Sequence, residues 1–218
     1  ELLCELVKIP NIYRIRLSSI EINEVTPEII DLYKNNKIMA RHLHVPLQSG
    51  SNKILKLMNR RYNKEEFMKM IDKLREIEDI SLTTDLIVGF PNETDDDFEE
   101  TMDTLKKIHF TKIHTFPYSR RRGTVADKMD GHISGDIKKK RVHEVIELSN
   151  EYENEYYKSK ISKVYDGVVE RHNNGLVVVH TSNFIPVIID DNDNIENNSI
   201  VNVKIEKVDG LNVYGRVV

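Results

Sequence analysis

Residues 82–94, LTTDLIVGFPNET, decide the class of fold. Their first nine residues form an apolar run rich in β-branched side chains, which is typical of a buried strand. A Gly-Phe-Pro sequence ends that run. Thr94 then offers an N-cap, and the three aspartates that follow it suit the positive end of a helix dipole. The stretch therefore predicts a strand that leads directly into a helix.

The same strand–helix unit recurs on both sides of this stretch. Further strands are predicted at residues 12–17, 42–47 and 112–117. Further helices are predicted from Thr26-Pro27, around residues 54–58, and from Asn63, whose capping box is completed by Glu66. Units of this kind indicate a parallel sheet covered by helices. Four of them are too few to close an eight-stranded barrel, so an open sheet or a partial barrel is expected.

The last third of the chain has a different pattern. A polar helix is predicted over residues 136–158, and five short Val/Ile-rich strands follow at 164–170, 176–180, 185–189, 200–205 and 213–218. Turn signals separate the strands at Asn174-Gly175, at 190–194 and at Asp209-Gly210. This predicts a small OB-like β-barrel. We therefore expect two domains, residues 1–158 and 159–218.

Composition limits the function classes. The chain has 218 residues, 39% of them hydrophobic and 31% charged, with a formal net charge of −4. No apolar run approaches the ~20 residues of a membrane helix, and no leader opens the sequence. The single cysteine, Cys4, forms neither a disulfide framework nor a thiolate metal site by itself. A cytoplasmic protein without a membrane partner is expected. Because the chain opens at Glu1 without an initiator Met, we expect a processed or truncated piece.

Polar residues gather where the predicted parallel strands end, which is where such sheets bind ligands. Ser18 follows the first strand, Gln48 and Ser49 follow the second, and Tyr118 follows the fourth. Hydroxyl and amide groups of this kind suit a nucleoside or an amino acid. Each strand end taken alone is equally consistent with ordinary turn and capping chemistry.

Charged residues also interrupt the strands themselves, namely Arg14, Arg16, His42, His44 and Asp85. Unpaired burial of such groups is costly, so they must face a polar cavity or one another. Strand alternation places the two arginines on one face and the two histidines on one face. A solvated interior lined by paired charges explains them as well as a ligand does. The His-x-His pair also suggests a metal, but no nearby third ligand supports one.

Two basic clusters, Arg120-Arg121-Arg122 and Lys138-Lys139-Lys140-Arg141, follow the fourth strand and open the long helix. They are either a solvated surface or a path for a phosphate backbone. The barrel segment is mildly acidic, and its stacking aromatics would be Tyr165, Phe184 and Tyr214.

Four ordered motifs carry a family resemblance: RIRLSSIE (14–21), RHLHVPLQSGSNKILKLMNRRY (41–62), TTDLIVGFPNET (83–94) and FPYSRRRGT (116–124). They resemble the radical S-adenosylmethionine methylthiotransferases over nearly the whole chain, and the final β segment resembles their TRAM domain. The second and fourth motifs look most like the branch that methylthiolates N6-threonylcarbamoyladenosine beside the tRNA anticodon. The branches that act on isopentenyladenosine in tRNA or on a ribosomal protein remain alternatives.

The resemblance implies a partial (β/α) barrel of the radical SAM type, truncated at its N-terminus, followed by a TRAM barrel. The family uses S-adenosylmethionine and two [4Fe–4S] clusters held by cysteine thiolates. Reductive cleavage of S-adenosylmethionine yields a radical that abstracts hydrogen from the substrate. Both sets of cluster cysteines are absent here, and the surroundings of Cys4 match no cluster motif. The chain therefore looks like the carboxy-terminal part of such an enzyme, without metal ligands of its own.

The resemblance also implies roles for individual residues. The S-adenosylmethionine cavity would be lined by Arg16, Ser18, His44, Gln48, Ser49, Asp85 and Tyr118. The tRNA partner would meet Arg120, Arg121, Arg122, Lys138, Lys139, Lys140 and Arg141. Two positions depart from the family. Asn92 stands where glycine is usual, which the left-handed backbone conformation would allow, and Val125 stands where proline is common.

Three hypotheses follow. The first is a fragment of a tRNA methylthiotransferase that is inactive alone and self-associates through an exposed strand edge at Ile12–Leu17. The second is a non-catalytic RNA-binding module, in which the barrel remnant only supports the TRAM domain. The third, an unrelated α/β enzyme, is disfavoured by the order of the four motifs.

Overall fold

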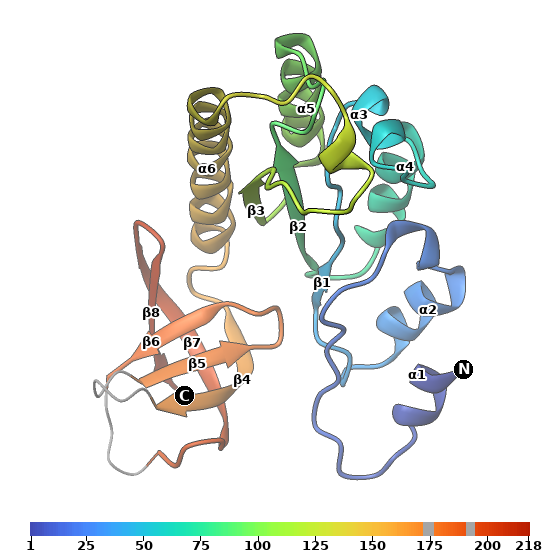
Figure 1. Ribbon diagram of the computed structural model, residues 1–218. Coiled ribbons are helices and arrows are strands. Elements are labelled where there is room, and N and C mark those ends of the chain that lie inside the picture. Colours follow the sequence, from blue (N-terminus) through green and yellow to red (C-terminus); the bar gives the residue numbers. More distant parts are fainter. Residues whose placement is uncertain (172–176, 191–194) are drawn as a thin grey trace.

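The computed structural model describes residues 1–171, 177–190 and 195–218 (Figure 1). Its helices are α1 (Leu2–Leu6), η1 (Ile22–Glu24), α2 (Pro27–Asn35), α3 (Asn52–Leu57), α4 (Lys64–Leu74), α5 (Asp95–Ile108), η2 (Ala126–Lys128) and α6 (Gly135–Lys158). Its strands are β1 (His42–His44), β2 (Ser81–Val88), β3 (Lys112–Pro117), β4 (Val164–Arg171), β5 (Val177–Thr181), β6 (Pro186–Ile189), β7 (Ile200–Asp209) and β8 (Asn212–Val217). Among the described residues, no helix is long and apolar enough to cross a membrane.

The first sheet has three parallel strands in the order β1-β2-β3. The predicted strand at Ile12–Leu17 is wrong, because that segment makes only an isolated parallel bridge between Ile15 and Met39. Beside that bridge, the Arg14 guanidinium contacts the Asp166 carboxylate on β4 at 2.5 Å instead of facing a sheet neighbour. The long-range contact with the second part of the chain replaces strand pairing, and the edge expected to drive self-association is not a strand.

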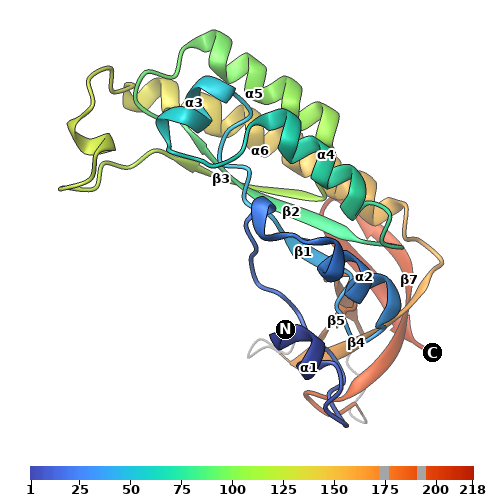
Figure 2. The ribbon, with the colours of Figure 1, turned by 90° about the vertical axis from the view of Figure 1, so that its right-hand side faces the viewer.

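The two faces of this sheet differ. Helices α3, α4, α5 and α6 cover one face (Figure 2), where Leu43, Leu82, Leu86 and Ile113 are buried in the main core. Predicted caps start two of the helices. Asn63 and Glu66 form a capping box on α4, and Thr94 and Asp97 form one on α5. Side chains alternate along a strand, so His44, Asp85 and His114 emerge from the opposite face.

The last third forms a closed five-stranded barrel in the order β4-β5-β6-β8-β7. Strands β6 and β8 pair in parallel, and the other pairs are antiparallel. Its interior is apolar and includes Val169, Val179, Ile205 and Val213. The small barrel expected from the sequence is thus confirmed. Asp209-Gly210 makes the predicted turn between β7 and β8, with Gly210 at φ +60°. The predicted turn at Asn174-Gly175, and most of the one at 190–194, lie outside the described residues.

The barrel joins the sheet through polar contacts around Asp79. The Lys160 ammonium and the Asn183 side-chain amide both donate to the Asp79 carboxylate, the second at 3.1 Å. The Arg41 N–H donates to the Ser182 carbonyl at 2.7 Å. These contacts bring the β5–β6 turn of the barrel up to the start of β1. The polar face of the sheet and one end of the barrel therefore enclose a common space.

Candidate functional site

A hollow of about 610 Å³ lies between the polar face of the sheet and the barrel, and we call it the polar hollow. Its walls come from every strand of the sheet, from α6 and from the β5–β6 turn. The lining residues are Arg16, Ser18, His42, His44, Ser81, Thr83, Asp85, Thr111, Lys112, His114, Phe116, Glu153, Tyr156, Tyr157, His180, Asn183, Phe184, Ile185, Pro186 and Leu211.

Register places the polar side chains of neighbouring strands side by side. His44 lies opposite Thr83, and Asp85 lies opposite His114. The His44 Nε2 atom is 3.2 Å from the Asp85 carboxylate, and the rings of His44 and His114 are 5.7 Å apart. Of the strand-interrupting charges predicted to face a polar cavity or one another, Arg16, His42, His44 and Asp85 line the polar hollow, whereas Arg14 pairs with Asp166.

Two of these histidines are held in the neutral form. Burial, followed by the nearby positive charge of Arg16, lowers the pKa of His42 to about 4. Burial, followed by the charge of Lys112, also lowers the pKa of His114. At neutral pH both rings therefore act as uncharged hydrogen-bonding groups.

Phe184, at the tip of the β5–β6 turn, reaches into the polar hollow. Its ring lies 4.3 Å from the Arg16 guanidinium carbon and 4.8 Å from the His42 ring. The residue has φ of 65°, unusual for a bulky side chain. The turn is fixed by hydrogen bonds, since Thr181 Oγ1 accepts from the Ile185 N–H at 2.9 Å. An aromatic side chain of the barrel thus forms part of the wall around Arg16.

The structure brings four of the predicted cofactor residues together. Arg16, Ser18, His44 and Asp85 line the polar hollow.

Three other predicted residues lie outside it. The Gln48 N–H donates to the Asp85 carbonyl at 2.9 Å, and Gln48 itself has φ of 68°. Ser49 is buried, with its hydroxyl 3.3 Å from that of Thr101 on α5. The Tyr118 ring packs edge-on against Phe90, with its hydroxyl buried and unpartnered among the described residues.

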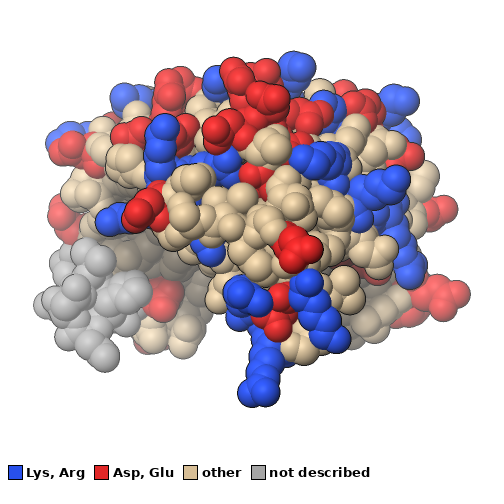
Figure 3. Space-filling view, turned by 45° about the horizontal axis from the view of Figure 1, so that its top comes forward, with Lys and Arg blue, Asp and Glu red and all other residues tan. Residues whose placement is uncertain are grey.

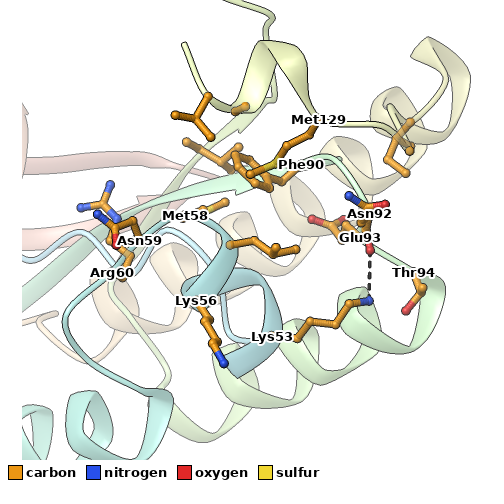
Figure 4. Close-up of a pocket in the computed structure, with 16 residues that line it drawn as sticks. Lys53, Lys56, Met58, Asn59, Arg60, Phe90, Asn92, Glu93, Thr94 and Met129 are labelled. Carbon is orange, nitrogen blue, oxygen red and sulfur yellow. Dashed lines mark hydrogen bonds between the residues drawn. The ribbon is translucent and has the colours of Figure 1, made fainter.

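A second hollow of about 1500 Å³ lies beyond the end of β2, between α3 and the segment after β3 (Figure 4). Met58, Phe90 and Met129 give it an apolar floor, and Lys53 lies at its rim, where its ammonium donates to the Asn92 carbonyl at 3.0 Å. Asn92 has φ of 67°. This is the left-handed conformation expected for Asn at a position where the family usually has glycine. Sequence reasoning missed this hollow, because its floor combines helix and loop residues far apart in the chain.

The basic clusters divide into exposed and structural residues. Arg121, Arg122, Lys139 and Lys140 are exposed, and Arg120 pairs with Asp127 at 2.9 Å. Lys138 donates to the Tyr118 carbonyl at 3.0 Å. The face shown in Figure 3 carries charges of both signs rather than a continuous basic surface.

Arg141 was expected to meet tRNA, but the structure places its side chain in the interior. It is 4% exposed, and its guanidinium contacts Glu93 at 2.6 Å and Asp95 at 2.7 Å. The contact with Glu93 is buried, and both contacts join α6 to the start of α5, so Arg141 does not present its charge to a partner. We leave it out of the RNA surface proposed below.

The donor set of this chain does not fit an iron–sulfur cluster. Cys4 is exposed and is the sole cysteine of the sequence. Among the described residues, no group of three or more His, Cys, Asp or Glu side chains could hold a metal ion. The hydroxyl, imidazole, carboxylate and guanidinium groups of the polar hollow do fit the ribose and amino-acid ends of a nucleoside-type cofactor.

Comparison with known proteins places this geometry in a class. The Radical SAM superfamily model matches residues 1–105. Among solved structures, coproporphyrinogen III oxidase (HemN) from Escherichia coli, a radical SAM enzyme, matches with a TM-score of 0.55 and 16% identity. That match covers 78% of this chain and 46% of HemN, and it supports the fold alone. The parallel sheet with its polar face is thus a radical SAM fold.

Curated relatives narrow the class to a family. The tRNA-2-methylthio-N(6)-dimethylallyladenosine synthase of Thermodesulfovibrio yellowstonii is 41% identical over 220 residues, covering 100% of this chain and 50% of the relative. The threonylcarbamoyladenosine tRNA methylthiotransferase MtaB of Thermotoga maritima is 43% identical over 164 residues, covering 75% and 38%. The chain belongs to the radical S-adenosylmethionine methylthiotransferase family. It spans about half the length, or less, of these relatives.

Proposed function

We propose that this chain is the carboxy-terminal part of a tRNA methylthiotransferase that modifies N6-threonylcarbamoyladenosine next to the anticodon. The observation that carries the proposal is the meeting of Arg16, Ser18, His44 and Asp85 in one polar hollow. They come from three of the four sequence motifs, and together they offer both donors and acceptors. The small barrel, in this proposal, is the TRAM domain that meets the tRNA.

The residues of the hollow have distinct roles in this proposal. The Asp85 carboxylate accepts hydrogen bonds from ribose hydroxyls or from an ammonium group. The Arg16 guanidinium binds the carboxylate of the methionine part. Ser18 and His44 contribute further polar contacts. S-adenosylmethionine, when bound beside a cluster, supplies the radical chemistry, while this chain binds and orients it. Because the cluster thiolates are missing, the isolated chain is expected to show no iron–sulfur absorbance after anaerobic reconstitution.

The substrate branch is supported by the motif forms RHLHVPLQSGS and FPYSRRRGT at residues 41–51 and 116–124. The relatives carry names from both the threonylcarbamoyladenosine and the dimethylallyladenosine branches. The test is disruption of the gene that encodes this chain, followed by mass spectrometry of tRNA nucleosides. The expected result is loss of the methylthio form of N6-threonylcarbamoyladenosine. Loss of the isopentenyladenosine derivative instead would assign the other branch.

A second candidate function, RNA binding without catalysis, is favoured by the exposed positions of Arg121 and Lys139. If this surface follows a phosphate backbone, tRNA affinity should fall as salt rises. The Arg121→Ala, Lys139→Ala double variant should bind more weakly and show a shallower salt slope than the wild-type chain. Lys69→Ala, an exposed change on α4, is the matched control. Affinity indifferent to salt would exclude this function.

A further inference from the structure

The polar hollow contains a row of hydrogen-bonded side chains that extends beyond the predicted cofactor residues. The Asp85 carboxylate lies 3.2 Å from His44 Nε2. His44 Nδ1 lies 3.0 Å from Thr83 Oγ1, which in turn lies 3.1 Å from His42 Nε2. Thr83 and His42 are both buried, with 6% and 4% exposed surface. The row therefore joins a partly exposed carboxylate to a buried ring.

For an ionised Asp85 and an uncharged His44, elementary valence fixes the direction of every hydrogen bond in this row. An ionised carboxylate only accepts, so His44 Nε2 carries the proton that it donates to Asp85. Nδ1 of neutral His44 is then an acceptor, and the single hydroxyl proton of Thr83 points to it. The Thr83 oxygen must accept from His42 Nε2–H. His42 Nδ1 is left as a bare lone pair.

The far end of the row has no competing partner. His42 Nδ1 is buried and has no hydrogen-bond partner among the described residues. The Phe184 ring lies 4.8 Å from the His42 ring. Reversing the row would place a proton on that nitrogen and bury an N–H group without an acceptor, which is costly. The uncharged His42 ring at one end and the Asp85 carboxylate at the other thus favour the same direction of hydrogen bonding along the row.

We propose that Thr83 and His42 are positioning residues, which hold His44 as the Nε2–H tautomer and thereby aim the Asp85 carboxylate at the ligand of the polar hollow. The ligand class is a molecule that donates hydrogen bonds from ribose hydroxyls or from an ammonium group. Its identity as S-adenosylmethionine rests on the function proposed above. The proposed tautomer of His44 does not depend on that function.

Several other charged or titratable groups surround the row and must be held constant in any test. They are Arg16 before β1, Lys112 and His114 on β3, Glu153, Tyr156 and Tyr157 on α6, and His180 on β5. Among the described residues, none of them is a hydrogen-bond partner of Thr83 or of either histidine in the row. Changing Thr83 therefore tests the row without removing a charge.

The first experiment is ¹⁵N NMR of the histidine rings in the ligand-free chain at neutral pH, since ring nitrogens that carry a proton differ in shift from those that do not. The expected result is a protonated Nε2 and a bare Nδ1 for both His42 and His44. Thr83→Val should produce a mixture of tautomers at His42, whose Nε2–H loses its acceptor, and Thr83→Ser should restore the wild-type pattern. Thr115→Val, which removes a hydroxyl without a hydrogen-bond partner on β3, should change nothing.

An unchanged tautomer in Thr83→Val, or a protonated His42 Nδ1 in the wild type, would overturn the proposal. If Thr83→Val fails to fold, Asp85→Asn serves as the second variant. An amide both donates and accepts, so it no longer dictates the direction of the row. The buried Nδ1 of His42, which has no acceptor among the described residues, should still keep His42 as the Nε2–H tautomer, and a protonated Nδ1 in Asp85→Asn would also overturn the proposal.

The second experiment measures binding affinity by calorimetric titration with three ligands. S-adenosylmethionine is the complete ligand, 5′-methylthioadenosine tests the ribose alone, and methionine tests the ammonium group. Thr83→Val should weaken S-adenosylmethionine binding about three- to tenfold, the effect of one hydrogen bond, and Thr83→Ser should restore it. Unchanged affinity together with a lost tautomer would overturn the positioning role. Failure of the wild-type chain to bind any of the three would instead contradict the proposed function, while the NMR result still decides the tautomer.

Discussion

The two faces of the β1–β3 sheet show how one short element serves stability on one side and binding on the other. Leu86 points into the helix-covered core and is fully buried, whereas its neighbour Asp85 points into the polar hollow. The covered face is closed by helices α3, α4, α5 and α6 (Figure 2). The polar face is closed by the barrel, through side chains such as Phe184. Changes on the covered side should therefore cost folding free energy, and changes on the polar side should cost affinity.

The largest effect is expected for Arg141→Met, on the covered side. It leaves the Glu93 carboxylate, 4% exposed, without its guanidinium partner. Breaking a buried pair in this way costs about 3–5 kcal/mol of unfolding free energy. Chemical denaturation measures it. Arg120→Met, which breaks an exposed pair with Asp127, is the control and should cost about 0–1 kcal/mol.

The same variant should respond to pH in a defined direction. Burial already raises the pKa of Glu93 above its ordinary value of 4.5, although hydrogen bonds from the Gly89 N–H and the charge of Arg141 oppose the rise. Without Arg141 the folded-state pKa rises further. A raised carboxyl pKa contributes stability below the unfolded value and loses it as pH rises through the folded value. Arg141→Met should therefore lose stability, relative to the wild type, as pH increases above about 4.5. A difference between the two proteins that does not vary with pH would contradict this assignment.

Leu86→Ala should cost about 2–5 kcal/mol, because it leaves a cavity in the covered core. Ile87→Ala provides a neighbouring comparison, since Ile87 is half-buried and points away from that core. We expect it to cost less than half as much in the same denaturation experiment. Equal losses at the two positions would mean that the faces do not differ in packing.

Asp97→Asn should cost about 1–2 kcal/mol at neutral pH, because it weakens the capping box of α5 and the contact with Lys53. Burial opposes ionisation, but hydrogen bonds from Lys53, Thr94 and Ser51 outweigh it and lower the pKa of Asp97 to about 2. Stability from a lowered carboxyl pKa is present above the unfolded value and is lost as pH falls. The wild-type and variant curves should therefore converge between pH 3.8 and about 2. Asp96→Asn, an exposed change in the same helical turn, should leave the acid response unchanged.

The smallest effect on stability is expected at Phe184, on the polar side. Its side chain is 42% exposed, and the loss of its contact with Arg16 should cost about 0.5–1 kcal/mol. Phe184→Ala should nevertheless weaken S-adenosylmethionine binding, because Arg16 loses the ring that holds it. Phe116→Ala, also exposed and at the rim of the same hollow, tests whether any aromatic ring there is sufficient.

Local sequence signals predicted the covered face well. The capping box at Asn63, the N-cap at Thr94 and the apolar run that became β2 depend on neighbouring residues, and all three are confirmed. The alternating charges of β1 and β2 predicted a polar cavity for the same reason. Short-range patterns are sufficient where an element's own residues decide its structure.

Contacts between distant segments explain what the sequence could not predict. Residues 12–17 have a strand-like sequence. Tyr13 and Arg14 nevertheless interact with Asp166, which lies more than 150 positions later in the chain. Arg141 reads as part of a basic cluster, but the fold buries it against Glu93. Phe184 joins the polar hollow only because the barrel folds back onto the sheet. No local pattern carries this information.

The most direct test of the central claim is titration of the chain with S-adenosylmethionine, with binding located by chemical-shift changes in NMR spectra. The claim predicts that Ser18, His44 and Asp85 respond, and that Asp85→Asn and His44→Gln weaken binding while Arg122→Ala does not. Responses confined to the hollow around Phe90 and Met129, with unchanged affinity in both polar-hollow variants, would contradict it.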